Sequence, residues 1–141
     1  MIRFFFENTK PAVKKRNLIK NIIQNIVTDN GFTTGDLSII FCNDDYLLDI
    51  NKKFLKHDYY TDIITFDQSD NNVISGDLYI SMERVKENAK IYRTTYTSEL
   101  FRVIFHGVLH LVGYEDKDDE SSKKMREKEN YYLSKMDGNE K

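Results

Sequence analysis

The sequence lacks the features that mark disulfide-bonded secreted domains and membrane proteins. It has one cysteine, Cys42, one proline and no tryptophan in 141 residues. A single cysteine cannot form an internal disulfide, so we expect Cys42 to be a small buried hydrophobic residue in a reducing compartment. No stretch reaches the ~18 apolar residues of a membrane span, and the apolar run at 2–6 is too short for a signal sequence. These absences predict a soluble, cytoplasmic protein.

Neither sign of charge is in strong excess. The chain has 21 basic and 23 acidic residues, which give a formal net charge of −2. Such a balance provides no long-range attraction for nucleic acid. Any surface that binds nucleic acid must therefore be a local group of basic residues.

Length and hydrophobic periodicity predict a single α+β domain. A chain of this size buries about two thirds of its unfolded surface, so we expect one domain over residues 1–136 and a disordered tail at 137–141. Apolar runs predict strands at 2–6, 36–42, 63–66 and 73–80, of which the last two form a hairpin. Helical spacing and capping residues predict helices that begin at Pro11, at Asn43 or Asp44, at Ser81, at Thr97 and at Asp118 or Asp119. Their order predicts a small mixed sheet covered by helices.

His106, His110 and a carboxylate that follows them have the spacing of metal ligands. On a helix, side chains four residues apart lie one above the other with Cβ atoms roughly 6 Å apart, so both imidazoles can reach one ion. Gly113 is expected to end that helix and to turn the chain, so that Asp116 folds back toward the same ion. Two nitrogens and one carboxylate oxygen suit Zn²⁺ and leave a fourth position for water, as in catalytic sites. The sequence therefore predicts one zinc ion per chain, held by these three side chains.

The competing interpretation is an exposed histidine pair without a function. At about 100° per residue, the apolar residues of 101–112 fill one broad arc, and Glu99, Arg102 and His110 cluster around His106 outside it. The histidines thus flank the core face, which argues against two buried core histidines. Gly107 excludes the metalloprotease signature His-Glu-x-x-His, because the second residue of that signature is the general base.

The segment 106–116 resembles the zinc-binding signature of the YbeY family of endoribonucleases, also called rRNA maturation factors. In that signature, His-Gly-x-Leu-His-Leu-x-Gly-Tyr-Asp-His, three histidines bind zinc. This chain has Glu115 and Asp116 where the family usually has Asp-His, so the resemblance places Asp116 at the third ligand. It also implies a zincin-like fold in which the metal-binding helix lies beside the sheet.

A second segment, 51–66, resembles the family pattern Leu-Asn-x-x-Tyr-Arg-x-Lys-Asp-x-Pro-Thr-Asp-Val-Leu-Ser-Phe. The positions that match it identically are Asn51, Asp58, Thr61, Asp62 and Phe66. Leu55 stands where the family has an arginine thought to serve RNA binding or cleavage, and Tyr60 replaces a proline. The segment 76–81 resembles the Gly-Asp-Ile-x-Ile-Ser strand of the family. Three motifs in the family's order are far more specific than any one of them alone.

Basic residues gather beside this second motif and are our candidates for RNA contacts: Lys52, Lys53, Lys56 and His57. Basic groups near a metal both position RNA and offset charge at the cleaved phosphate. His57 is also a candidate for shuttling a proton, although a histidine in a basic stretch is more often a surface residue.

Two further residues each have two open interpretations. Asp62 faces the cleft or makes a turn, and Tyr114 stacks on a base or packs under the chain reversal.

The resemblance implies a zinc-dependent endoribonuclease that acts on single-stranded rRNA in ribosome maturation and quality control. Its partners are then rRNA and the ribosome or a ribosomal protein. Leu55 favours an alternative, a non-catalytic ribosome assembly factor that uses its metal only for structure. A third hypothesis is a metal-dependent hydrolase of another phosphoester. The open three-ligand site favours an enzyme, because it is a costly way to build a structural clamp.

Overall fold

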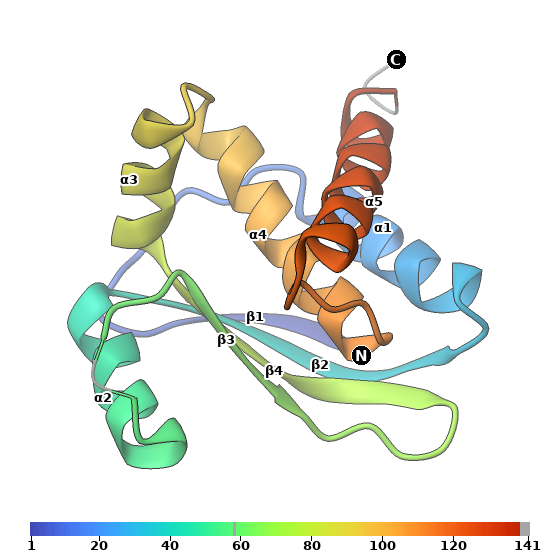
Figure 1. The fold of residues 1–141 in the computed structure, drawn as a ribbon, viewed down its shortest axis with the longest axis horizontal. Coiled ribbons are helices and arrows are strands. Elements are labelled where there is room, and N and C mark those ends of the chain that lie inside the picture. The colour runs from blue at the N-terminus through green and yellow to red at the C-terminus, as the bar shows by residue number, and fades with distance from the viewer. Residues whose placement is uncertain (58, 139–141) are drawn as a thin grey trace.

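Four strands form one mixed sheet in a computed structural model that describes residues 1–57 and 59–138, with side chains up to residue 136 (Figure 1). The strands are β1 (Ile2–Phe6), β2 (Thr33–Cys42), β3 (Ile63–Asp67) and β4 (Val73–Ser81), in the spatial order β1-β2-β4-β3. β1 and β4 both pair with β2 in parallel, whereas β3 pairs with β4 as an antiparallel hairpin. The mixed sheet and the hairpin confirm the sequence prediction.

The central strand β2 is apolar on both faces, because both faces of the sheet are covered near it. Leu37, Ile39 and Phe41 point into the main core, whereas Cys42 belongs to a smaller cluster on the other face. β1 differs, since it lies at the edge and alternates buried Ile2 and partly buried Phe4 and Phe6 with exposed residues. Phe5 is 42% exposed there. The apolar run at 2–6 is therefore an edge strand with one open face.

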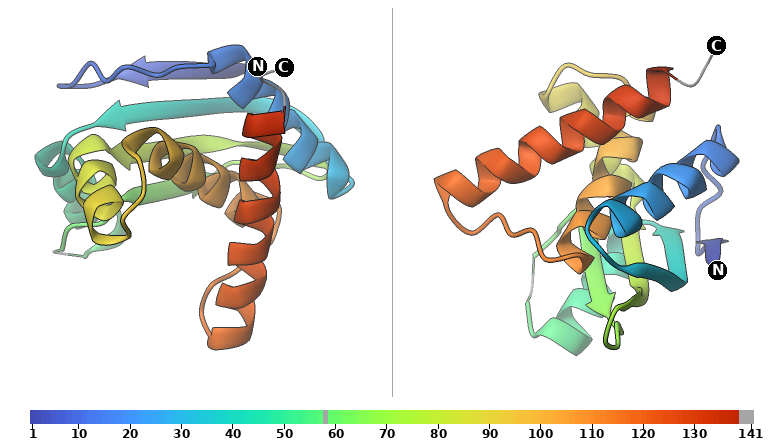
Figure 2. Two further views of the ribbon diagram at one scale, coloured as in Figure 1. Left: turned by 90° about the horizontal axis from the view of Figure 1, so that it is seen from above. Right: turned by 90° about the vertical axis from the view of Figure 1, so that its right-hand side faces the viewer.

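The helices cover the two faces of the sheet unequally (Figures 1 and 2). Four lie on one side: α1 (Arg16–Asp29), α3 (Met82–Ile91), α4 (Tyr96–Leu111) and α5 (Asp119–Gly138). α4 rests directly on β3 and β4, and α5 packs on α4 and α1 as an outer helix. On the opposite side lies α2 (Asp44–Leu55), which contacts β3 and β4. The main core thus surrounds α4, the helix that carries both candidate ligands.

Two predicted helix starts are confirmed by their caps, and two are wrong. The side chains of Asn43 and Ser81 accept hydrogen bonds from the backbone of the first turns of α2 and α3. α4 is capped by Thr95 and not by Thr97, since the Thr95 hydroxyl accepts from the Ser98 amide. α1 begins at Arg16 and not at Pro11, because Lys15 has a left-handed backbone with φ 58° that a right-handed helix cannot include.

The C-terminal helix begins where the sequence predicts. Asp118 precedes α5, and its carboxylate accepts a hydrogen bond of 2.8 Å from the Ser121 amide. The helix continues to Gly138, while residues 139–141 of the expected disordered tail lie outside the described residues, as does Asp58. In the described part of the chain, no helix is both long and apolar enough to cross a membrane.

Candidate metal centre

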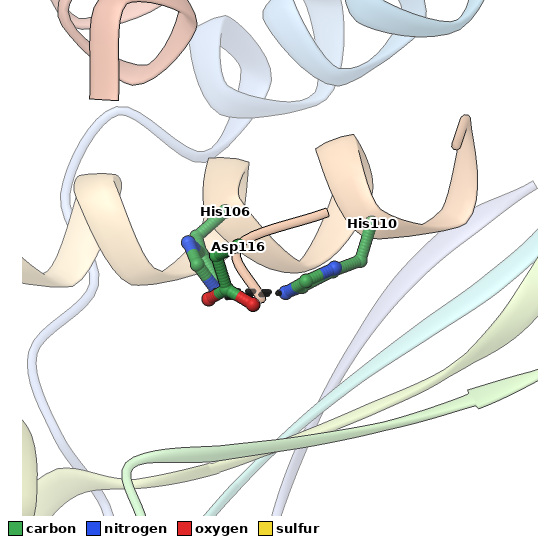
Figure 3. A group of neighbouring side chains, drawn as sticks. All are labelled: His106, His110 and Asp116. Carbon is green, nitrogen blue, oxygen red and sulfur yellow. Dashed lines mark hydrogen bonds and ion pairs between the residues drawn. The ribbon is translucent and has the colours of Figure 1, made fainter. Parts of the chain in front are cut away.

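The end of α4 returns the chain toward the helix, and this reversal brings Asp116 to the histidines (Figure 3). Gly113 adopts a left-handed φ of 110°, which a residue with a side chain rarely takes. The Gly113 amide donates a hydrogen bond to the carbonyl of His110, and the Tyr114 amide donates one to the carbonyl of Leu109. The N···O distance is 3.0 Å in both. These two bonds form a Schellman motif, in which a glycine closes a helix and satisfies its last carbonyls. The predicted helix stop at Gly113 is confirmed.

Three ligand atoms converge in front of α4. The Nε2 atoms of His106 and His110 lie 3.0 Å apart, and Oδ2 of Asp116 lies 3.5 and 3.7 Å from them. Two ligands of one tetrahedral zinc lie about 3.3 Å apart, as follows from bond lengths near 2.0 Å. The triangle of donor atoms therefore fits a single zinc-sized ion.

The contacts of the two Nδ1 atoms determine which nitrogen of each imidazole ring is free to bind a metal ion. Nδ1 of His110 lies 2.9 Å from the carbonyl oxygen of Tyr114, and Nδ1 of His106 lies 2.6 Å from Oε2 of Glu129. A carbonyl and a carboxylate only accept, so both Nδ1 atoms carry the proton. In the neutral rings, the two Nε2 lone pairs then face each other across 3.0 Å. Such a pair of lone pairs is stable only with a proton or a metal ion beside it.

Glu129, on α5, is a part of the site that the sequence analysis missed. Its side chain is only 5% exposed, and its other oxygen accepts a 2.9 Å hydrogen bond from Nη1 of Arg102. Burial alone would raise the pKa of Glu129, but the hydrogen bonds from His106 and Arg102 outweigh it and lower that pKa. Burial would likewise lower the pKa of His106, but Glu129, Asp116 and Asp62 together raise it. The one feature of the sequence that pointed toward Glu129 was the clustering of Arg102 near His106. Glu129, the partner of Arg102, lies 27 residues further along the chain, on α5.

A cavity of ≈ 180 Å³ opens beside the ligand triangle, between α3, α4 and α5. His106 and Asp116 line one side of it, and Arg102, Arg126 and Tyr92 contribute to the rest. It is smaller than the roughly 300–1,000 Å³ of pockets that enclose drug-sized molecules. The cavity therefore offers room for part of a substrate next to the candidate ion.

The structure decides between the interpretations of Asp62 and Tyr114. Asp62 lines the cavity with His106, and burial raises the pKa of its carboxyl, which accepts from Asn88 over 3.4 Å. Tyr114 packs against the main core, and its hydroxyl donates to Asn30. The cleft-facing interpretation of Asp62 and the packing interpretation of Tyr114 are confirmed.

The basic candidates for RNA contacts lie at the C-terminal end of α2, apart from the ligand triangle: Lys52, Lys53, Lys56 and His57. All four are exposed, and in the described part of the chain none of them lines the cavity. Lys53 forms an ion pair of 3.0 Å with Asp49, and His57 stacks on Tyr59. Leu55, at the family's arginine position, is 38% exposed. Of the second motif, Asp62 lines the cavity beside the ligand triangle.

Comparison with known proteins gives a consistent result. The family model described as endoribonuclease YbeY matches residues 5–137. Proteins named endoribonuclease YbeY from Parabacteroides distasonis and Cytophaga hutchinsonii are 45% and 46% identical to this chain over 134 residues, 94% of each chain compared. The solution structure of TM1509 from Thermotoga maritima is similar with a TM-score of 0.65 and 32% identity, over 98% of this chain and 90% of that one.

Proposed function

Since the chain belongs to the YbeY family of endoribonucleases, we propose that it is a zinc-dependent endoribonuclease that cleaves single-stranded rRNA in ribosome maturation and quality control. His106, His110 and Asp116 hold one zinc ion per chain. The observation that carries this proposal is the convergence of their three donor atoms, with both Nδ1 atoms held by acceptors. A pair of histidines without a function would not need its rings fixed in this way.

When bound, zinc supplies Lewis acidity for the hydrolysis of a phosphodiester. The residues of the chain determine the net charge of the occupied centre and how a substrate reaches it. Two neutral imidazoles and one carboxylate leave the occupied centre with a net positive charge, which attracts a phosphate. Asp116 is 44% exposed on its side chain, so the triangle is open on that side. Arg126 lines the cavity and is 56% exposed on its side chain, so its guanidinium can also meet a phosphate.

We place the contacts with the RNA backbone on the basic group at the end of α2, with His57 as a weaker candidate for proton transfer. Three lysines and one histidine on a chain of net charge −2 provide a local attraction that the whole molecule lacks. The segment after this group leads to Asp62, which lines the cavity. We further propose that residues 1–136 act as one domain. In this proposal the protein works in the cytoplasm, with the ribosome or a ribosomal protein as its partner.

The first prediction tests zinc-dependent cleavage. Protein loaded with zinc should cleave a labelled single-stranded rRNA fragment, a chelator should abolish cleavage, and added zinc should restore it. His106→Ala and His110→Ala should each lose stoichiometric zinc, measured by elemental analysis, because two ligands cannot retain the ion tightly. Both variants should also lose cleavage.

The double variant Lys53→Glu with Lys56→Glu should instead keep zinc and weaken RNA binding, with a smaller dependence of affinity on salt.

The controls separate an enzyme from a binding factor. His57→Ala removes an imidazole outside the triangle and should keep full zinc occupancy. Zinc binding without chelator-sensitive cleavage of any rRNA fragment would favour the assembly-factor alternative. Full zinc occupancy in both ligand variants would show that the proposed site is wrong.

A further inference from the structure

We propose that Glu129 is a positioning residue for the metal centre: through His106, it aims one ligand nitrogen at the ion and raises the affinity of the site for zinc. This inference rests on the proposed zinc site and adds to it a residue from another helix. Glu129 does not reach the ligand triangle itself. It acts through the far side of the His106 ring.

The contact between Glu129 and His106 is short and shielded from water. Oε2 lies 2.6 Å from Nδ1 of His106, and the Glu129 side chain is only 5% exposed. A hydrogen bond between a carboxylate and an imidazole N–H fixes the proton on Nδ1 and fixes the orientation of the ring. Nε2 is then left with a lone pair directed at His110 and Asp116. Coordination of zinc through Nε2 requires this tautomer.

Glu129 is itself held in place by Arg102. Nη1 of Arg102 donates to Oε1 of Glu129 over 2.9 Å, and Nη2 donates to Asn130 over 3.0 Å. A buried carboxylate is costly unless it is paired and hydrogen-bonded, and here each of its oxygens has a partner. If Glu129 served only to attach α5 to α4, its contact with Arg102 through Oε1 would be enough. Its second oxygen, Oε2, contacts the ligand His106 as well.

The two histidines are supported in different ways, and this difference makes the inference testable. His110 donates from Nδ1 to the backbone carbonyl of Tyr114, which every side-chain variant retains. His106 depends on a side chain 23 residues further along the chain, on α5. Loss of Glu129 should therefore disturb the ring of His106 and leave that of His110 unchanged. Each molecule contains its own internal control.

The test compares Glu129→Gln with Glu127→Gln, an exposed glutamate on the same helix. Zinc affinity is measured by competition with a chromogenic chelator, and the imidazole N–H signals of the zinc-loaded proteins are recorded by nitrogen-15 NMR. Glutamine keeps the size of the side chain but removes its charge. We expect Glu129→Gln to lose about 10- to 100-fold in zinc affinity. We also expect the Nδ1–H signal of His106 to shift or exchange faster, with the His110 signal unchanged. Glu127→Gln should match the parent in both measurements.

A second variant keeps the inference testable if Glu129→Gln does not fold. Glu129→Asp retains the charge and draws the carboxylate back by one methylene, so it should weaken zinc binding less than Glu129→Gln and still alter the His106 signal alone. Parent-like affinity and an unchanged His106 signal in a folded Glu129 variant would overturn the inference. If the parent itself binds no stoichiometric zinc, the proposed metal centre fails, which is a separate result.

Discussion

Asp116 is the proposed ligand at which this chain departs from the family signature, and its surroundings leave room for the difference. Its carboxylate approaches both imidazoles to within 3.7 Å, and its side chain is 44% exposed. An exposed position at a chain reversal tolerates a longer side chain better than a buried one. A carboxylate also brings negative charge, which makes a bound ion a weaker Lewis acid than a third imidazole does.

Substitutions at Asp116 should therefore separate ligand number from ligand type. Asp116→His restores three imidazoles and should retain stoichiometric zinc. Asp116→Ala leaves two protein ligands and should lose more than the roughly 10- to 100-fold in affinity that the loss of a supporting hydrogen bond costs. Competition with a chelator measures both. Glu115→Ala, at an exposed neighbour that pairs with Lys117, serves as the control and should bind as the parent does. Parent-like affinity in Asp116→Ala would remove this residue from the ligand set.

Local spacing was sufficient to predict that the three candidate donor atoms converge, because their residues lie within 11 positions on one helix and the turn that follows it. The glycine stop and the i, i+4 spacing are properties of the backbone alone. Glu129 could not be found in this way. Its role depends on how α5 packs against α4, and helical periodicity does not state which helices become neighbours.

At the scale of elements, the starts of three helices were predicted from their capping residues, and the starts of α1 and α4 were missed. Asn43 and Ser81 are followed directly by the first turn of a helix, and both cap it. Before α4, Thr94, Thr95 and Thr97 are equally suited by residue type, and it is the Thr95 hydroxyl that accepts from the first turn. Pro11 is compatible with a first turn, but the chain reaches α1 only after the left-handed residue Lys15.

Gly76 and Gly107 both lie where a neighbouring element approaches the glycine closely, and the atoms that approach them differ. A Cβ at Gly107 would meet the side-chain tips of Leu78 and Ile63 at 2.6 and 2.7 Å. A Cβ at Gly76, on β4, would instead meet the backbone carbonyl of Phe66 on the paired strand β3. Side-chain tips can rotate away, whereas a carbonyl in a sheet can move only with its strand.

The same substitution should thus cost different amounts at the two positions. Gly107→Ala gains about 1 kcal/mol of helix propensity against about 1–3 kcal/mol of overpacking, so we expect a net loss of about 1 kcal/mol in the free energy of unfolding. Gly76→Ala has no helical gain and should lose about 3 kcal/mol, at the upper end of overpacking costs. Urea denaturation with comparable m-values measures both. Equal losses, or a larger loss at Gly107, would contradict this account of the two contacts.

At the scale of the whole molecule, the sheet has one heavily covered face and one lightly covered face. The fold class followed from the sequence, because a predicted strand hairpin followed by a run of helices is typical of an α+β domain. The strand order β1-β2-β4-β3 did not follow, since it depends on crossovers between strands that are distant in sequence. The candidate metal centre lies on the side of α4. Cys42 lies on the other face with Leu47 and Ile64, beneath α2.

This division predicts that Cys42 and the metal centre respond independently to local opening. Burial, with the charges of Asp44 and Glu7, raises the pKa of the Cys42 thiol to about 12, so the thiol reacts only when its cover opens. α2 buries only Leu47 and Asn51, whereas α4 buries ten residues. Opening of α2 should therefore require less free energy than global unfolding.

Zinc distinguishes the two kinds of opening, because it stabilises only states in which the ligand triangle is intact. At a free concentration 100 times its dissociation constant, it should add about 2.7 kcal/mol to the free energy of global unfolding and raise the urea midpoint accordingly. The rate at which a disulfide reagent labels Cys42 without denaturant should stay the same with and without zinc, since α2 can open while α4 and Asp116 remain in place. His110→Ala, which we expect not to bind zinc, is the control in which neither quantity responds to the ion. If zinc instead slows labelling of the parent about 100-fold, α2 opens only when the whole fold does, and the two faces of the sheet form one cooperative unit.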